Sequence, residues 1–508
     1  MSGTPLVIGL DSSTTATKAI AWDMTGTAVA EGRAPVAMTN PKLGHFEQDS
    51  RDWWHAAATA LKACTEAVDP SAIKGLAISN QRETVGFLDA DGEPVRPAML
   101  WVDERSRNEV RELSETFGAE RIHEITGRPP DLTPCLYRLL WFTKNEPELA
   151  AKTKVYCDVQ TFLVQRLCGG SFRTSWSSAD PLGMFDLKAR TWSAPLLEAI
   201  AIDEAQLPEA HPPGTALGTV TKAAAEATGL LEGTPVFAGG GDGQLAGLGT
   251  NCTRSDRAYI NLGTAVVSGV WSPDYLFNPA WRSQIAGQGK GYIFENCLRS
   301  GTFLVNWFVD NFVPGGRDDP SVFQRLEEEA LALPVGSDGV MLQPYWSGVM
   351  DPHWDVDARG VILGLSASHR PAHVYRAILE GITLDQVGRT RSMEAAMGAS
   401  VDHYLAIGGG AASPLWRQML ADASGKEVRL SGTVEASALG AGMLAAAGAG
   451  LFPSIEDAAA EMSGETTSIA PDANVAERYA ALLDIYQTLF AATRDVNRRL
   501  VAFAAGDE

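Results

Sequence analysis

The chain has 508 residues, enough for two large domains at a prior of roughly 150 residues per domain. Its hydrophobic content of 45% and charged content of 20% are those of an ordinary globular protein. The formal net charge of −21 argues against a nucleic-acid backbone or an anionic membrane surface as the main partner. The net charge does not exclude phosphate ligands, because phosphate binding depends on hydrogen-bond donors at the site rather than on the charge of the whole protein.

The first segment, residues 6–23, predicts a β-hairpin. Two apolar runs flank a Ser/Thr-rich tip in LVIGLDSSTTATKAIAWD, with Asp11 at its entrance and Lys18 just beyond. The tip hydroxyls and backbone N–H groups are suited to an anion. A helix over 53–68 is predicted next, with Asp49 as its N-cap.

Residues 75–88, GLAISNQRETVGFL, predict one strand that carries Gln81, Arg82 and Glu83 and resumes at 98–101. Consecutive polar residues inside a strand pattern are unusual for a core. An Arg and a Glu at a strand end can donate to and accept from substrate hydroxyls, as polyol recognition requires. A surface ion pair explains the same residues about as well.

Residues 236–249, VFAGGGDGQLAGLG, predict a strand, a glycine-rich turn and a helix, with Asp242 as the lone carboxylate at the strand tip. Such a carboxylate can accept a proton from a substrate hydroxyl or help hold a metal. It could also simply cap the helix. Gly241, Gly243 and Ala246 satisfy a loose dinucleotide-binding pattern. We rank that second, because Asp242 would face the pyrophosphate.

The hairpin plan recurs at 259–271, YINLGTAVVSGVW, which suggests a duplicated domain whose copies each lend a phosphate-facing loop to a shared cleft. Residues 343–364 predict a loop and 373–383 a helix. Residues 405–423 predict a strand, three glycines and a helix, a geometry typical of nucleotide contacts.

The remaining features are structural. The uncharged run 436–455 is broken by glycines and Pro453, so we expect a tightly packed helix rather than a membrane span. Residues 474–503 are amphipathic, with a stripe that includes Tyr479, Tyr486, Val496 and Leu500. The six cysteines form no C-x-x-C pair and no signal peptide is visible, so free thiols and a cytoplasmic location are expected.

Six motifs in order resemble the FGGY family of carbohydrate kinases over essentially the whole chain. They are GLDSSTTATKAIAWD, ISNQRET with LWVDERS, GGGDGQ, NLGTAVVSG, PHWDVDARGVILGL and IGGGAASPLWRQMLAD. The resemblance implies an α/β fold with two ribonuclease H-like (actin/hexokinase/Hsp70 ATPase) domains flanking a central cleft. It implies an N-terminal domain at 1–250, a C-terminal domain at 251–450, and helices over 451–508 packing on the core.

The resemblance also implies transfer of the ATP γ-phosphoryl group to a sugar or polyol hydroxyl, with Mg²⁺. Asp242 matches the general base, and Asp11 with Asp242 matches the metal site. The implied residues are, for substrate, Arg82, Glu83, Trp101, Asp242 and Gln244, and for nucleotide, Thr14, Thr15, Lys18, Gly263, Thr264, Gly409, Gly410 and Ser413.

Substrate signals conflict within the resemblance. The Gln81–Thr84 segment and Trp101 look like glycerol kinase, whereas the later motifs look more like xylulokinase. At the position after the second phosphate loop where glycerol kinases have an aromatic residue, this chain has Val267. It also has no tyrosine within residues 130–135, the second departure from glycerol kinases. A wider pocket follows, which favours a substrate longer than glycerol. The expected substrate is a ketopentose-like sugar or polyol, with D-xylulose as the first choice and glycerol, erythritol and ribulose as the alternatives.

Two other functional classes stay open from the sequence. One is an NAD-dependent oxidoreductase using the Gly241 loop, and the other is a catalytically silent sugar sensor. The expected partners are a small sugar or polyol and ATP, with no nucleic acid and no membrane. A homodimer is left open.

Overall fold

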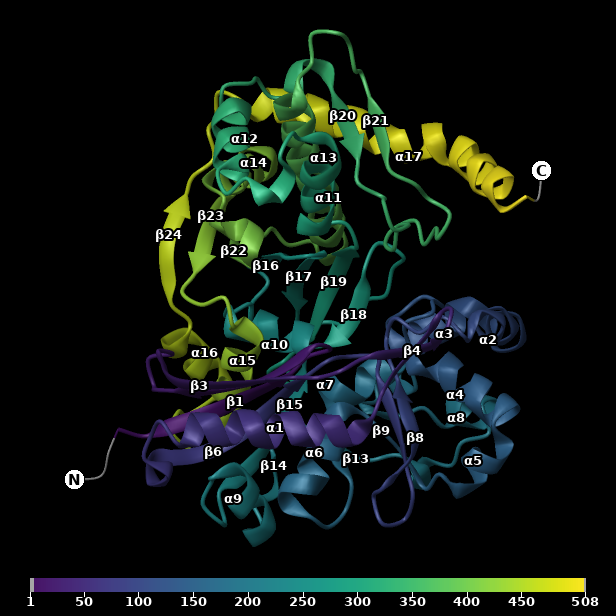
Figure 1. Cartoon of the computed structure of the whole chain (residues 1–508), viewed down its shortest axis with the longest axis vertical. Coiled ribbons are helices and arrows are strands. Elements are labelled where there is room, and N and C mark those ends of the chain that lie inside the picture. Colours follow the sequence, from purple (N-terminus) through teal and green to yellow (C-terminus); the bar gives the residue numbers. More distant parts are fainter. Residues whose placement is uncertain (1–3, 507–508) are drawn as a thin grey trace.

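The computed structural model describes residues 4–506 and shows an α/β chain organised around two large sheets. The N-terminal sheet lies in the lower part of the molecule and the C-terminal sheet in the upper part (Figure 1). The N-terminal sheet has the strand order β14-β15-β6-β1-β2-β3. These strands span Ala216–Thr219, Pro235–Gly241, Ile73–Asn80, Leu6–Ser12, Ala16–Trp22 and Ala28–Pro35.

The C-terminal sheet has the order β18-β19-β17-β16-β22-β23-β24. Its strands span Arg282–Ile285, Tyr292–Leu298, Val266–Ser272, Arg257–Leu262, His403–Ile407, Glu427–Ser431 and Glu465–Ile469. Both predicted hairpins are confirmed, as β1–β2 and β16–β17. In each sheet the first hairpin strand also pairs in parallel with a later strand, β6 or β22. The shared plan supports the predicted duplication.

Smaller sheets complete the strand inventory. A five-stranded sheet, β4-β5-β8-β7-β9, spans Thr39–Lys42, His45–Gln48, Pro94–Met99, Val85–Leu88 and Val155–Cys157. Three two-stranded pairs are β10–β13 (Arg173–Ser175, Glu209–His211), β11–β12 (Phe185–Asp186, Thr191–Trp192) and β20–β21 (Met341–Gln343, Val361–Leu363).

Helices cover these sheets. In the first part of the chain, α1 to α10 span Ser50–Thr65, Arg107–Leu113, Ala119–Thr126, Cys135–Asn145, Pro147–Lys152, Val159–Cys168, Trp176–Ala179, Ala194–Ala199, Lys222–Thr228 and Asp242–Gly249. Further along, α11 to α17 span Thr302–Phe312, Val322–Leu331, Pro371–Met397, Pro414–Ser424, Ala436–Gly448, Ile455–Met462 and Ala476–Ala505.

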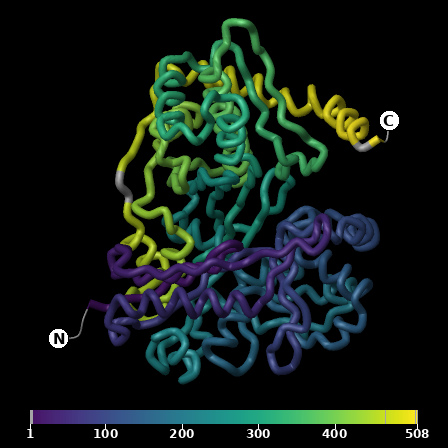
Figure 2. Tube along the Cα trace, in the orientation of Figure 1, coloured from purple at the N-terminus to yellow at the C-terminus, as the bar shows by residue number. Residues whose placement is uncertain are grey.

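Strand β1 is buried on both faces, which explains its continuous apolar run. Successive side chains of a strand point to opposite faces. Ile8 belongs to the apolar cluster that includes α1, whereas Val7 belongs to the cluster that includes α15. After β23 the trace returns to the lower part of the molecule, where α15 packs on β1 and β6 (Figure 2). The predicted division at residues 250 and 450 stays a prediction, although α15, which lies before residue 450, packs on strands of the N-terminal sheet.

Helices α10 and α15 approach so closely that glycine is required at the contact. A Cβ on Gly440 would lie 2.1 Å from the carbonyl oxygen of Leu245 in α10. The predicted packed helix within 436–455 is thereby confirmed. Within residues 4–506 no helix is both long and apolar enough to span a bilayer.

Gly440→Ala is therefore expected to lower the free energy of unfolding by about 1–3 kcal/mol, the range for overpacking a tight contact. Gly388→Ala in α13 is the matched control, because a Cβ there would meet only atoms at 3.7 Å or farther. Alanine's helix propensity should leave that variant as stable or slightly more stable. Thermal unfolding of both variants checks the contrast, and equal melting temperatures would contradict it.

Three sequence predictions need correction. Residues 75–88 are two strands in different sheets, β6 and β7, and residues 81–84 lie in the loop between them. The helix predicted at 373–383 lies in the first half of a longer one, α13. The stripe on the C-terminal helix is buried only in its first part: Val496 and Leu500 are exposed because α17 extends past the body it packs on (Figure 1).

Other predictions are confirmed. Asp49 caps α1, its side chain accepting from the Arg51 N–H. Residues 403–424 form β22, a short 3-10 turn and α14, and the C-terminal segment is helical. All six cysteines are free thiols: Cys64, Cys135, Cys157, Cys168, Cys252 and Cys297.

Candidate active site

Asp242 stands where β15 passes into α10, as the sequence predicts. The Gly243 N–H donates to its Oδ1 at 2.8 Å, and Ser437 Oγ donates to its backbone carbonyl at 3.0 Å. Burial in the surrounding protein raises the pKa of Asp242, while the Arg82 guanidinium opposes that rise. The side chain still keeps 38% of its exposure. The carboxylate is thus both tuned by its surroundings and open to a ligand.

Arg82 connects Asp242 to the opposite sheet. Its Nε lies 2.9 Å from Asp242 Oδ1. Its Nη1 donates to Gln284 Oε1 at 2.7 Å and to Glu295 at 3.0 Å, on strands β18 and β19 of the C-terminal sheet. A predicted substrate residue is therefore fixed from both halves of the molecule. Neither Gln284 nor Glu295 was predicted from the sequence.

Glu83, next in the loop, is held by arginines rather than left open. Its carboxylate is 3.3 Å from Arg282 and 3.6 Å from Arg128, and the residue is only 6% exposed. Its backbone φ of 49° lies in the left-handed region, which is uncommon for a residue other than glycine. Strained backbone of this kind clusters at functional sites.

Gln244 is fully buried, and its side chain bonds to neighbouring protein groups. Its Nε2 donates to the Ser177 carbonyl at 3.0 Å and lies 3.3 Å from Asp180, while its Oε1 has no partner among residues 4–506. This geometry gives Gln244 a supporting place behind Asp242, where the resemblance implies direct substrate contact. Trp101, by contrast, is 40% exposed and donates from Nε1 to Thr14 Oγ1 at 3.1 Å. That bond joins a predicted substrate residue to a predicted phosphate loop.

Asp11 is buried at the end of β1 and accepts from Ser79 Oγ at 2.7 Å. Burial raises its pKa to about 6, and the negative charge of Asp242 adds to the rise. Residues 4–506 contain no group of three or more His, Cys, Asp or Glu side chains arranged for a metal. Mg²⁺, however, usually needs only one or two carboxylates beside water and substrate phosphates. Two mutually repelling carboxylates fit such an ion, since a cation would relieve both.

The two hairpin tips have the exposure that phosphate loops require. Thr14 is half-buried and Thr15 exposed at the first tip, and Thr264 is exposed beside the half-buried Gly263 at the second. Lys18 is not free, because its Nζ pairs with Glu435 Oε2 at 2.7 Å.

The glycines after β22 leave room for a ligand. A Cβ on Gly409 would meet no atom within 4 Å, whereas one on Gly410 would strike the Trp416 ring at 2.6 Å. Ser413 caps α14, its Oγ accepting from the Trp416 N–H at 3.1 Å. Gly409 thus offers open backbone, as close approach of a nucleotide requires.

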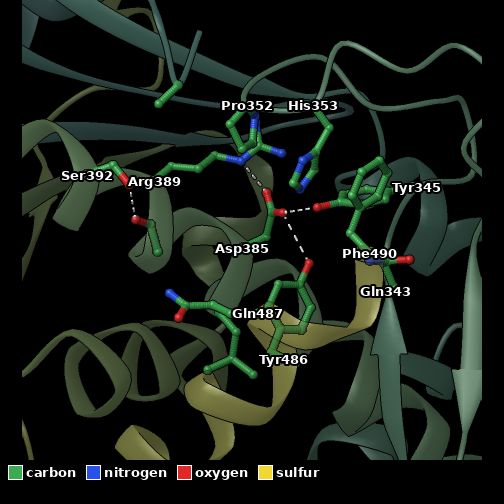
Figure 3. A pocket seen from close by; sticks show the side chains of 13 residues that line it. Gln343, Tyr345, Pro352, His353, Asp385, Arg389, Ser392, Tyr486, Gln487 and Phe490 are labelled. Carbon is green, nitrogen blue, oxygen red and sulfur yellow. Dashed lines mark hydrogen bonds and ion pairs between the residues drawn. The ribbon is translucent and has the colours of Figure 1, made fainter. Parts of the chain in front are cut away.

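A separate pocket lies in the upper part of the molecule between α13, α17 and the 343–353 segment (Figure 3). Its cavity volume is about 150 Å³, and none of the predicted site residues lines it. At its base Asp385 pairs with Arg389 and accepts from the hydroxyls of Tyr345 and Tyr486. The Asp385 carboxylate is thus paired, although Arg389 Nη2 has no hydrogen-bond partner among residues 4–506.

Comparison with known proteins gives two family models that cover most of the chain. The model described as "FGGY family of carbohydrate kinases, N-terminal domain" matches residues 6–249, and the corresponding C-terminal domain model matches residues 258–449.

Two curated relatives match over nearly their full length. A xylulose kinase of Bacillus subtilis (strain 168) is 30% identical, covering 98% of this chain and 99% of the relative. A gluconokinase of the same organism is 26% identical, covering 96% of each. Among solved structures, a xylulose kinase from Rhodospirillum rubrum superposes with a TM-score of 0.90 at 27% identity, covering 97% of this chain and 99% of the other.

Proposed function

Because the chain belongs to the FGGY family of carbohydrate kinases, we propose that it transfers the γ-phosphoryl group of ATP to a hydroxyl of a ketopentose-like sugar, with D-xylulose to xylulose 5-phosphate as the first candidate reaction. The observation that carries the proposal is the 2.9 Å contact between Asp242 and Arg82 at the start of α10. It places a proton acceptor and a cationic hydrogen-bond donor side by side, which is what a hydroxyl nucleophile needs.

Asp242 is the base in this proposal. It accepts the proton of the attacking hydroxyl, while Arg82 and the partly exposed Trp101 hold the carbon chain in line. Glu83 keeps the loop in its strained conformation through Arg282 and Arg128. Gln244 supports the first turn of α10 from behind.

The nucleotide side uses the remaining predicted residues. Thr14, Thr15, Lys18, Gly263 and Thr264 would hold phosphates, Gly409, Gly410 and Ser413 would hold the nucleoside, and Asp11 with Asp242 would hold Mg²⁺. Bound Mg²⁺ neutralises the charge that develops on the phosphates. Lys18 must exchange or share its Glu435 partner to reach a phosphate.

Ketopentose is favoured over glycerol by the small side chain of Val267 and by similarity to known proteins. Val267 stands on β17 where glycerol kinases carry an aromatic, and in this structure it is half-buried against the cluster that contains Tyr259 and Ile293. A xylulose kinase is 30% identical to this chain and covers 98% of it. The dinucleotide interpretation of Gly241, Gly243 and Ala246 receives no support, because both family models describe carbohydrate kinases.

The deciding experiment is a coupled ADP-release assay over D-xylulose, D-ribulose, xylitol, erythritol, glycerol and gluconate. The proposal expects the highest kcat/KM for a ketopentose. Preference for gluconate or glycerol would keep the kinase and overturn the ketopentose. No ADP release with any acceptor would overturn the proposed function.

Asp11→Ala should raise the Mg²⁺ concentration needed for half-maximal rate by roughly tenfold or more, the scale seen when a metal's supporting groups are lost. The sugar KM should change little, because Asp11 faces the phosphate side of Asp242. Asp23→Ala is the control, since that carboxylate only closes its own turn through Thr25 and Thr27. Rates measured against Mg²⁺ at fixed ATP test this. An unchanged Mg²⁺ requirement in Asp11→Ala would remove Asp11 from the metal site.

A further inference from the structure

Glu295 is a charged residue that the proposed reaction does not yet use. It lies on β19, is fully buried, and accepts hydrogen bonds from Arg82 at 3.0 Å, Gln284 at 2.8 Å and Tyr259 at 3.1 Å, with Arg282 also paired to it. Burial alone would raise the pKa of Glu295, but the Arg82 and Arg282 guanidinium groups hold it down to about 2. The carboxylate is therefore a fixed negative charge.

This charge fixes the orientation of Arg82. The guanidinium uses Nε on Asp242 and Nη1 on Glu295 and Gln284. Its Nη2 makes no hydrogen bond within residues 4–506. A planar guanidinium held at two nitrogens has no freedom left to rotate. The remaining nitrogen, Nη2, lies beside Gly243, the residue that follows Asp242, where an added Cβ would be 2.6 Å from it.

Strand β19 is itself anchored two residues farther on. The Cys297 N–H donates to Asp351 Oδ1 at 3.0 Å, and the Cys297 carbonyl accepts from Arg389 Nη1 at 3.2 Å. Arg389 is tied to Asp351 and, at 2.6 Å, to Asp385. The hydroxyls of two tyrosines complete this network at Asp385 (Figure 3). The backbone that carries Glu295 is thus locked from α13 and α17.

We propose that Glu295 is the positioning residue of the sugar site: from the C-terminal sheet it orients Arg82 so that one guanidinium nitrogen faces a substrate hydroxyl beside Asp242. This inference rests on the proposed function and assigns the C-terminal sheet a part in binding the sugar. A purely structural ion pair would contribute to folding alone. A positioning residue must in addition change sugar affinity, and must do so through Arg82.

Glu295→Gln is expected to raise the sugar KM about tenfold or more, the scale for weakening a charged hydrogen bond, while the ATP KM stays within about threefold. The sugar Kd from calorimetry without ATP should rise by a similar factor. Glu380→Gln is the matched control, because Glu380 is a buried carboxylate on α13 bonded to Arg376, Gly336 and Ser337. That variant should lower the melting temperature and leave the sugar KM unchanged.

The double variant separates positioning from an independent contact. In an Arg82→Ala background, Glu295→Gln should change the sugar KM by less than about twofold, because a residue that acts through another is not additive with it. Equal factors in both backgrounds would overturn the proposal. So would parallel increases in the sugar and ATP KM values. A wild-type enzyme inactive on every acceptor would instead defeat the proposed function.

If Glu295→Gln does not fold, Gln284→Leu is the variant in which the same sugar KM measurement is made. It removes the 2.7 Å acceptor of Arg82 Nη1 without stranding a charge. The sugar KM should rise about threefold, as for a lost hydrogen bond of average strength, and the rise should vanish in the Arg82→Ala background. An unchanged sugar KM in the single variant would overturn the inference.

Discussion

Asp242→Asn is expected to lower turnover by about 10² to 10⁴, the range for losing a positioned general base. Asparagine keeps the shape and can still accept the Gly243 N–H bond made by Oδ1. It cannot take a proton from the attacking hydroxyl. ATP and sugar binding should therefore stay nearly intact, which steady-state kinetics and calorimetry of the same preparation would show.

Asp158→Asn provides the control for this variant. Asp158 is also a buried carboxylate at the N-terminus of a helix, where it caps α6 by accepting from Thr161. Asparagine is a good N-cap, so turnover should be unaffected. If Asp242→Asn retained turnover within a few-fold of wild type, Asp242 would not be the base, and the 2.9 Å contact with Arg82 would be structural only.

The parts of this fold that were predictable from the sequence are those with a local pattern. The hairpins β1–β2 and β16–β17 are each predicted by two apolar runs on either side of a short tip of small and polar residues. Asp242 was singled out as the lone carboxylate after three glycines, and the other motifs along the chain favoured a functional role for it over that of a helix cap. Asp49 was found as an N-cap for similarly local reasons.

The loop at 81–84 was predicted as part of a strand, because the pattern of apolar residues does not show where the chain passes from one sheet to another. Residues on both sides are apolar and buried, so the segment 75–88 has the composition of one strand. The chain in fact leaves the N-terminal sheet at Asn80 and re-enters another at Val85, with Glu83 at positive φ between them. The consecutive polar residues indicated a functional site correctly, but they were not recognised as the end of one strand and the start of a loop.

Arg282, Gln284 and Glu295 were missed for a different reason. Gln284 and Glu295 contact Arg82, and Arg282 contacts Glu83, between segments that lie far apart in the chain; Gln284 and Arg82 are 202 positions apart. No local sequence pattern encodes such contacts. A usable signal was present, since Glu295 and Asn296 interrupt the otherwise apolar strand β19, and β18 has the sequence RSQI although it is buried. The same signal, read at Asn80–Thr84, had located the first half of the site. Burying a charged residue in a strand costs free energy unless the charge is paired, so such a residue indicates a candidate site in either sheet.

Arg82→Ala should have the second large effect, a rise in the sugar KM corresponding to about 1.5–3 kcal/mol for a lost charged hydrogen bond. The structure adds a consequence that the sequence did not. Removing Arg82 leaves Asp242 without its cation and Glu295 with only Arg282, Gln284 and Tyr259. We therefore expect kcat to fall as well. The ATP KM should change less than the sugar KM, because Asp242 is the one proposed nucleotide-side residue among the contacts described for Arg82.

The control must remove an equally buried arginine that is far from the sugar. Arg96 is 9% exposed and paired with Glu47 and Glu146 inside the N-terminal half. Arg96→Ala should lower the melting temperature by leaving buried carboxylates unpaired, with the ratio of kcat/KM between xylulose and glycerol unchanged. Arg82→Ala should lower kcat/KM for every acceptor, and most for those whose hydroxyls reach the guanidinium. If the two variants differed only in melting temperature and shared one acceptor profile, Arg82 would be a fold-stabilising cation, and the sugar would have to bind elsewhere than beside Asp242.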